Sequence, residues 1–217
     1  MKEYLPVICA SRLFAGLSPR QAAELLPRLS PRPASYGKGD YLLHAGEPVQ
    51  ALGLVLSGRV LVVKEDFWGG RNLLSSLGPG QCFAETFACV PGSILGVSVV
   101  ADASTLVLYL DLSSLLSAPE GVPLLRNLLT DMAGKNMAFT EKLTHLGQRT
   151  TRNKLLSYLS AQAQRRGSVE FDIPFTRQQL ADYLLVDRSG LSAELCKMRD
   201  EGLLDFHKNH FILRHTI

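Results

Sequence analysis

The feature that most constrains the fold is a series of short apolar segments between residues 35 and 111, each followed by a turn signal. The segments are rich in Val, Leu, Tyr and Phe and have the length of strands. Glycine-containing breaks separate them, as at Gly37-Lys38-Gly39-Asp40 and Gly78-Pro79-Gly80. We therefore predict a β-barrel of the jelly-roll kind, with strands at residues 41–43, 52–56, 60–63, 72–74, 97–100 and 105–109.

The segment before the barrel, residues 12–29, has apolar residues at helical spacing. Ser18-Pro19 suits the start of a helix, because serine caps the first turn and proline fits the first helical position. We expect this helical lead-in to pack on the barrel. Together the two parts predict a first domain at residues 1–118.

A heptad repeat marks the next segment, residues 119–147. Such a repeat is the a and d pattern of a coiled coil, and Asn136 at an a position favours a parallel dimer in register. The alternative is an amphipathic helix that packs on its own barrel. We predict a homodimer whose seam contains Val122, Leu125, Leu129, Met132, Asn136, Phe139, Leu143 and Leu146.

The last segment, residues 148–217, has the pattern of a winged helix-turn-helix. Thr176 followed by Gln179 is a capping box that begins one short helix, and Asp187 is suited to cap a second helix just after it. Two short apolar runs at residues 203–206 and 210–213 then predict a two-stranded wing. The fold class is thus α+β: barrel, long helix and winged helix-turn-helix.

In a helix-turn-helix, residues at the start of the second helix reach base edges in the major groove. Arg188 is our strongest candidate for a base contact, because its forked guanidinium matches a guanine edge. Other residues are expected to bond bases or phosphates, or to lie beside them. The predicted DNA-binding set is Thr176, Arg177, Gln178, Arg188, Ser189, Ser192, Ala193 and Lys197.

The charge distribution agrees with a nucleic-acid partner. Residues 1–146 carry 12 Lys+Arg and 12 Asp+Glu, whereas residues 147–217 carry 11 and 8, so the whole excess of +3 lies in the last third. Clustered positive charge is the electrostatic footprint of phosphate binding. A chance fluctuation of three charges is the alternative.

Other patterns are missing from the sequence. It has no apolar run long enough to span a bilayer and no signal peptide, so we expect a cytoplasmic protein. The four cysteines lie far apart, which argues against a disulfide scaffold or a zinc ribbon, and we predict no metal site. We predict no catalytic residues and no enzyme activity, because no Walker loop, HExxH or GxSxG motif is present.

The order of these parts resembles the Crp-Fnr family of transcription regulators. The resemblance covers nearly the whole chain and is most specific at Thr176-Arg177-Gln178-Gln179-Leu180-Ala181 and at Val186-Asp187-Arg188-Ser189-Gly190-Leu191-Ser192. It implies a barrel of the cyclic-nucleotide-binding type and a homodimer that binds a small effector. It also implies a near-palindromic DNA site and RNA polymerase as a partner.

The departures from the family concern the effector. Cyclic-nucleotide-binding members supply a Glu for the ribose and an Arg for the phosphate; Glu85 matches the first, but residues 90–98 contain no Arg. A phosphate buried without a cation is costly, so cyclic AMP is not the expected effector. Cys9 alone cannot hold the iron-sulfur cluster of oxygen-sensing members. Haem is a further alternative, with His44, Cys82 or Cys89 as its axial ligand.

We predict that the effector binds between the barrel and the long helix. The candidate residues are Leu73, Phe83, Glu85, Thr86, Val97, Val99, Asn136, Phe139 and Thr140. An acid among apolar walls suggests a small organic ligand. The main prediction is therefore an effector-controlled regulator of transcription, an activator or a repressor. The alternatives are a haem- or redox-sensing regulator of the same family and an effector-binding dimer that no longer binds DNA.

Overall fold

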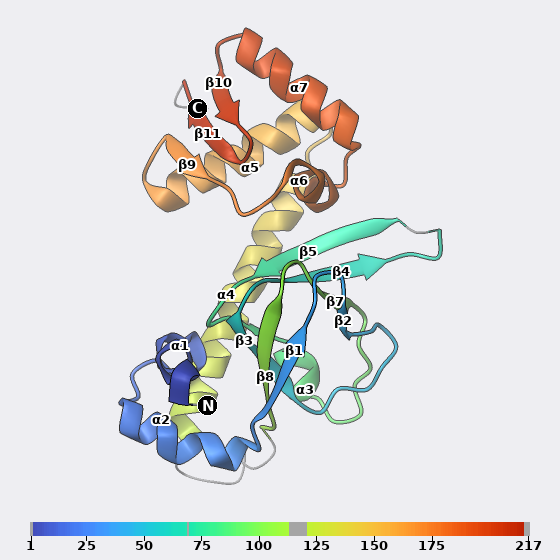
Figure 1. Ribbon diagram of the computed structural model, residues 1–217. Coiled ribbons are helices and arrows are strands. Elements are labelled where there is room, and N and C mark those ends of the chain that lie inside the picture. Colours follow the sequence, from blue (N-terminus) through green and yellow to red (C-terminus); the bar gives the residue numbers. More distant parts are fainter. Residues whose placement is uncertain (1, 69, 113–120, 215–217) are drawn as a thin grey trace. The chain divides into compact units, whose positions relative to one another are not determined.

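The structure, a computed structural model, describes residues 2–68, 70–112 and 121–214 (Figure 1). The chain divides into two compact units, residues 1–136 and 137–217. The predicted beginning of the long helix at Pro119 lies outside the described residues. Among the helices that are described, none is both long and apolar enough to cross a membrane.

The first unit begins with short helices that cover the barrel. The predicted start at Ser18 is confirmed as a full capping box: the Ser18 hydroxyl accepts from the Gln21 backbone, and the Gln21 side chain accepts from the Ser18 backbone N–H. The helices are η1 (Lys2–Tyr4), α1 (Leu5–Ala10), η2 (Arg12–Phe14), α2 (Pro19–Leu25) and η3 (Leu26–Leu29).

Two four-stranded antiparallel sheets form the barrel and confirm the predicted jelly-roll architecture. All six predicted strands are present, and several extend further than predicted. One sheet has the order β1 (Arg32–Tyr36), β8 (Thr105–Leu110), β3 (Leu52–Ser57) and β6 (Cys82–Phe83). The other has the order β2 (Tyr41–Leu43), β7 (Ser98–Ala101), β4 (Val60–Glu65) and β5 (Arg71–Leu77).

Strand β8 separates two apolar cores, because successive side chains of a strand point to opposite faces. Val107 and Tyr109 face the core between the two sheets, together with Phe83 of β6. Leu108 and Leu110 face a second core that the N-terminal helices complete. The barrel is therefore packed on its inner face and on the face covered by the helices.

Helices α3 (Glu85–Ala88) and α4 (Val122–Leu146) follow strands β6 and β8 in the chain. Leu124 and Leu128 of α4 are buried in the core of the N-terminal helices. The Asn127 side chain donates to the backbone oxygens of Leu13 (3.0 Å) and Ala15 (2.8 Å), which ties the start of α4 to these helices.

The second unit contains the end of α4 and the predicted winged helix-turn-helix. Its three-stranded sheet has the order β10-β11-β9, so the two strands of the wing pair with each other and β9 pairs with β11. The elements are α5 (Thr151–Arg166), β9 (Glu170–Asp172), α6 (Arg177–Leu184), α7 (Arg188–Asp200), β10 (Leu204–His207) and β11 (His210–Leu213).

Candidate functional site

Helices α6 and α7 begin and end where their capping residues dictate. The Thr176 hydroxyl accepts from the Gln179 backbone N–H at 3.3 Å, and the Gln179 side chain accepts from the Thr176 N–H at 2.9 Å. Leu185 ends α6 in the left-handed conformation, with φ of 52°. The Asp187 carboxylate then accepts from the Gly190 N–H at 2.8 Å and starts α7.

Helix α5 contacts both α6 and α7 and holds the turn between them in place. Lys154 donates to the backbone oxygens of Leu184 (3.0 Å) and Leu185 (3.4 Å), carbonyls at the end of α6 that the helix itself leaves unpaired. Arg152 forms ion pairs with Glu194 of α7 (2.7 Å) and with Glu201 (2.6 Å). The hydrogen bonds that Arg152 donates to Glu201 and Glu194 raise its pKa above the ordinary value.

One face of α7 is buried and the other is free. Leu191, Leu195 and Met198 are fully buried at helical spacing. On the exposed side, Arg188, Ser189, Ala193 and Lys197 are all exposed, whereas Ser192 is half-buried. Ser189 donates its hydroxyl proton to the Asp187 carboxylate, and this hydrogen bond lowers the pKa of Asp187. The exposed face thus carries two cationic side chains, Arg188 and Lys197. The buried face anchors the helix through Leu191, Leu195 and Met198.

Arg177, predicted to contact DNA, lies against the wing. Its guanidinium stands 4.9 Å from the ring centre of Phe206 and 5.5 Å from that of Phe211, and it donates to the backbone oxygen of Lys208 at 3.0 Å. Burial lowers the pKa of Arg177. These contacts join the start of α6 to the turn of the wing, a role that sequence reasoning missed because the partners are remote in the chain.

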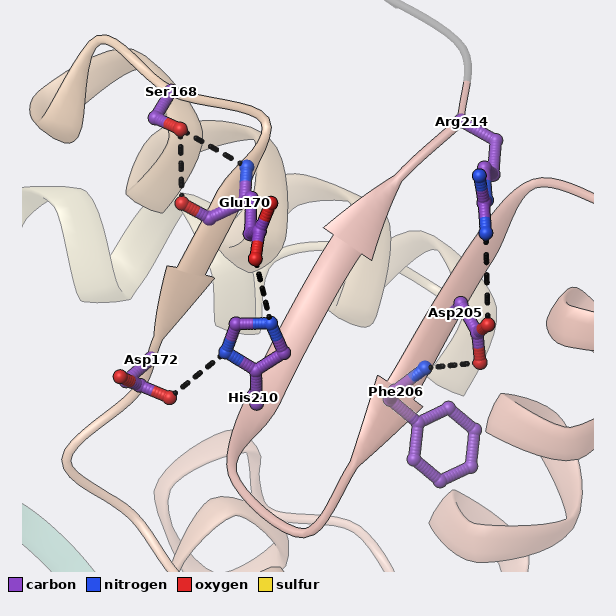
Figure 2. Close-up of polar contacts among 7 residues, drawn as sticks. All are labelled: Ser168, Glu170, Asp172, Asp205, Phe206, His210 and Arg214. Atoms are coloured by element: carbon purple, nitrogen blue, oxygen red, sulfur yellow. Dashed lines mark hydrogen bonds and ion pairs between the residues drawn. The ribbon is translucent and has the colours of Figure 1, made fainter.

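The three strands of the wing sheet are linked by polar contacts (Figure 2). His210 of β11 lies between two carboxylates of β9, with Nε2 3.3 Å from Glu170 and Nδ1 3.1 Å from Asp172. On β10, Asp205 accepts from the Phe206 N–H and pairs with Arg214 at 3.6 Å. These contacts tie β11 to β9 through His210, and β10 to the end of β11 through Asp205 and Arg214.

In the first unit, Glu85 is already engaged by a lysine of α4. Lys135 Nζ lies 2.9 Å from Glu85 Oε1 and 3.0 Å from Asp131 Oδ2, and it donates to the Cys82 backbone oxygen at 2.7 Å. Burial alone would lower the pKa of Lys135, but the two carboxylates raise it. Arg12 approaches Asp131 from the N-terminal helices at 3.6 Å. Two cations thus neutralise two buried carboxylates.

The other residues predicted to bind the effector are distributed through both units. Leu73, Phe83 and Val99 are buried, and Phe83 and Val99 belong to the core between the sheets. Val97 is half-buried and Thr86 is exposed. Asn136 ends the first unit, whereas Phe139 and Thr140 belong to the second.

The residues considered for haem have different environments. Cys82 is buried, and burial raises the pKa of its thiol to about 12, which disfavours the thiolate that binds metals. His44 is exposed and stacks on Tyr41 at 4.5 Å between ring centres. Within the described residues, no group of three or more His, Cys, Asp or Glu side chains could hold a metal ion.

Three a positions of the predicted seam lie on the uncovered side of α4, whereas Met132, at a d position, packs against the core of the N-terminal helices. Val122, Leu129 and Leu143, at a positions, are 60%, 70% and 68% exposed. Leu124 and Leu128, outside the seam, are 1% and 4% exposed. The helix therefore has a second apolar stripe besides the one that packs on its own unit.

Comparison with known proteins agrees with this arrangement. The sequence matches the profile of the cyclic nucleotide-binding domain over residues 33–120 and that of the Crp-like helix-turn-helix domain over residues 153–216. It is 29% identical over 86 residues to the CRP-like cAMP-activated global transcriptional regulator of Mycobacterium tuberculosis, covering 40% of this chain and 38% of that protein. The match to this relative therefore spans well under half of its length.

A longer match is to the Cyclic AMP receptor protein of Thermus thermophilus, 27% identical over 195 residues, which covers 89% of this chain and 88% of that one. Among solved structures, FixK2 from Bradyrhizobium japonicum shares the fold, with a TM-score of 0.67 at 23% identity, covering 86% of this chain and 93% of that one. Because a cyclic nucleotide-binding domain is followed by a Crp-like helix-turn-helix domain, the chain belongs to the Crp-Fnr family of transcription regulators.

Proposed function

We propose that the protein is a sequence-specific DNA-binding regulator whose affinity for DNA is controlled by a small effector in its N-terminal barrel. The observation that carries the proposal is the exposed face of α7, which presents Arg188 and Lys197 while Leu191 and Leu195 anchor the helix. A rigid helix with a free cationic face is what major-groove recognition requires. The protein acts by binding rather than by catalysis, in the cytoplasm where promoter DNA lies.

Within this surface we assign different roles to different residues. Arg188 reads a guanine edge, and Ser189, Ser192 and Ala193 lie beside the bases. Lys197 contacts phosphate, as do the capping residue Thr176 and its neighbour Gln178. Arg177 acts as a positioning residue, because its contacts with Phe206 and Lys208 hold the wing against α6.

We propose that the effector is not cyclic AMP, although two of the relatives are named for cyclic AMP. The Glu85 carboxylate that would bind a ribose is paired with Lys135 at 2.9 Å. Residues 90–98 supply no arginine for a cyclic phosphate. The predicted effector residues stay a prediction, and the raised pKa of Cys82 argues against its thiolate as a haem ligand.

We further propose a homodimer joined along the exposed stripe of α4. An apolar stripe with a heptad repeat and Asn136 at an a position supports a parallel pair of helices. Such a dimer would present two copies of α7 to a near-palindromic DNA site. From that site it would contact RNA polymerase, as an activator or a repressor.

The test of DNA recognition begins with selection of binding sites from randomised duplex DNA, followed by gel-shift titrations. We expect Arg188→Ala to weaken binding to the selected site by about 1–3 kcal/mol and to relax preference at one base pair per half-site. Arg166→Ala, which removes an exposed arginine of α5 outside the proposed surface, is the control.

Binding should also weaken steeply as salt increases, because phosphate contacts release counterions. If Arg188→Ala keeps its base preference, Arg188 is not a reading residue. If the wild-type protein selects no sequence at all, the proposed function is wrong and an effector-binding dimer without DNA recognition is favoured.

A further inference from the structure

A hollow of about 530 Å³ opens between the two sheets of the barrel, beside edge strands β1 and β2. These strands are the outer members of different sheets and do not pair with each other. The loop at residues 48–51 closes the far side. The volume is typical of pockets that bind small molecules, roughly 300–1,000 Å³. None of the residues predicted above to bind the effector lines it.

The walls of the hollow are apolar and its floor carries two tyrosines. Leu42 and Val49 are buried wall residues. The hydroxyls of Tyr36 and Tyr109 lie 2.9 Å apart and share a hydrogen bond, and Tyr109 also donates to the Leu42 backbone oxygen at 3.4 Å. Burial raises the pKa of Tyr109, and the hydrogen bond that it shares with Tyr36 raises it further, so its hydroxyl keeps its proton at neutral pH.

Arg32 supplies a cation at this place. Arg32, Ala34 and Tyr36 are alternate residues of β1, so their side chains share one face of the strand. All three line the hollow. The partner of Arg32 across the sheet is Tyr109. The Arg32 charge acts on Tyr109, since it opposes the rise in the pKa of that hydroxyl. Arg32 is exposed, and no carboxylate lines the hollow among the residues that the structure describes.

The floor is in contact with the segment that carries Glu85. The Tyr109 ring meets the Phe83 ring edge to face, with centres 6.1 Å apart. Phe83 covers Gly53 so closely that a Cβ there would lie 2.0 Å from the ring. Ala84 follows in the left-handed conformation (φ 60°) and leads directly to Glu85 and its ion pair with Lys135. A molecule that moved Tyr109 would therefore press on this segment.

We infer that the hollow binds a small organic anion with an apolar, ring-sized body, whose carboxylate pairs with Arg32 and whose body lies against Leu42, Val49 and Tyr109. The inference rests on the proposed function, because it names the place and the chemical class of the effector. An anion is favoured over a cation or a neutral ligand because Arg32 is the charged group that lines the hollow. A body the size of one or two rings is favoured because the hollow measures about 530 Å³.

The test measures binding of 2-naphthoate to the full chain in the absence of DNA, by the change in fluorescence anisotropy of this probe. We expect saturable binding of one molecule per chain. Arg32→Gln should weaken it about tenfold or more, because it removes a charge-assisted hydrogen bond. Ala34→Trp should abolish binding by filling the hollow. Lys38→Gln removes a nearby charge that does not line the hollow, and should leave binding within about twofold.

The uncharged probe 2-naphthamide should bind wild-type protein and Arg32→Gln equally. Circular dichroism of each variant verifies that it is folded. The inference is overturned if 2-naphthoate does not bind saturably, or if Arg32→Gln and Ala34→Trp bind it as well as the wild type. Because DNA is absent, this failure is distinct from failure of the proposed function, which the gel-shift titration reports by itself.

Discussion

At the residue scale, Lys142 is a buried cation in the second unit. It is 4% exposed, and its ammonium lies 4.5 Å from the ring centre of Tyr183 on α6. Burial lowers its pKa to about 8. His145, one turn further, is also buried, and burial lowers its pKa too. Ordinary charge patterning would place both side chains in solvent, so the sequence did not predict this environment.

We predict that Lys142→Met removes a pH dependence of stability. Below pH 8 the lysine is protonated in both states, so the folded protein bears the full cost of a buried charge. Between about pH 8 and 10.5 only the unfolded state keeps the proton, and the wild type becomes more stable as pH rises. Solvent screening limits this gain to about 1–2 kcal/mol.

The measurement is the free energy of unfolding of the second unit at pH 7 and pH 9.5, for wild type and Lys142→Met. The advantage of the variant over the wild type should shrink at the higher pH. His145 and the tyrosines are the same in both proteins and cancel in the difference. An equal difference at both pH values would show that Lys142 keeps an ordinary pKa.

Residue-scale prediction from the sequence was also uneven at the candidate sites. Glu85 was identified through the resemblance to the Crp-Fnr family, because it stands where nucleotide-binding members have a Glu. Its partner Lys135 was not, since the two lie 50 positions apart and nothing local to either marks the pair. Arg177 was identified as a cation near DNA, but its stacking on Phe206 depends on the wing folding back over α6. Local motifs predict which residues matter better than they predict contacts between them.

At the element scale, the sequence of α4 supports two interpretations, and the structure shows one of them directly. The apolar stripe containing Leu124 and Leu128 packs on the first unit, as the amphipathic-helix alternative requires. The heptad stripe containing Leu129 and Leu143 lies on the uncovered side, as a seam requires. Burial in one chain separates the two stripes, which periodicity alone could not.

We predict that Leu129→Glu converts the protein to a monomer at micromolar concentration. Leu129 is 70% exposed in the single chain, so the substitution costs the folded chain little, but in the dimer it would bury a charge against its twin. Thr130→Glu adds the same charge one position away, off the stripe, and should leave the dimer intact. Sedimentation equilibrium distinguishes the two; equal masses for both variants would contradict the seam.

Elements that the sequence did not predict have weak local signals. Strand β1 contains Pro33, which cannot donate to a sheet, yet the strand is tolerated because it is the edge of its sheet. Strand β6 has only two residues, Cys82 and Phe83, and is held by pairing with β3. Helix α1 has a proline in its first turn and no side-chain cap. By contrast, the cap at Ser18 and the capping box at Thr176 were both found, because these signals are defined within four residues.

At the scale of the whole molecule, the barrel of the first unit is joined to α4 by an internal ion pair where a nucleotide-binding relative is expected to hold its ligand. Lys135 joins α3 to α4, and Arg12 adds the N-terminal helices through Asp131. Glu85 Oε2 is buried and has no hydrogen-bond partner among the described residues. The cluster is therefore sensitive to loss of its cation.

We predict that Lys135→Met lowers the free energy of unfolding of the first unit by about 2–4 kcal/mol, because it leaves Glu85 as a buried, unpaired carboxylate and Asp131 with Arg12 at 3.6 Å as its remaining cation. Adding Glu85→Gln to the same chain should recover part of the loss, since the unpaired charge at Glu85 is then removed. Arg20→Met, in an exposed pair on α2, should cost less than about 1 kcal/mol. If Lys135→Met and Arg20→Met lower the free energy of unfolding equally, the buried cluster is worth no more than an exposed ion pair.

The same cluster predicts how the whole protein responds to cyclic AMP. A ligand that binds only the folded state raises its melting temperature in proportion to the logarithm of its concentration. Because Glu85 is already paired and residues 90–98 offer no arginine, millimolar cyclic AMP should change neither the melting temperature of the wild type nor its affinity for the selected DNA site. Differential scanning fluorimetry and the gel-shift titration measure the two effects independently. A rise in melting temperature that is lost in Glu85→Gln would mean that the nucleotide displaces Lys135 from Glu85, and that the ion pair serves as a latch rather than as a replacement for the ligand.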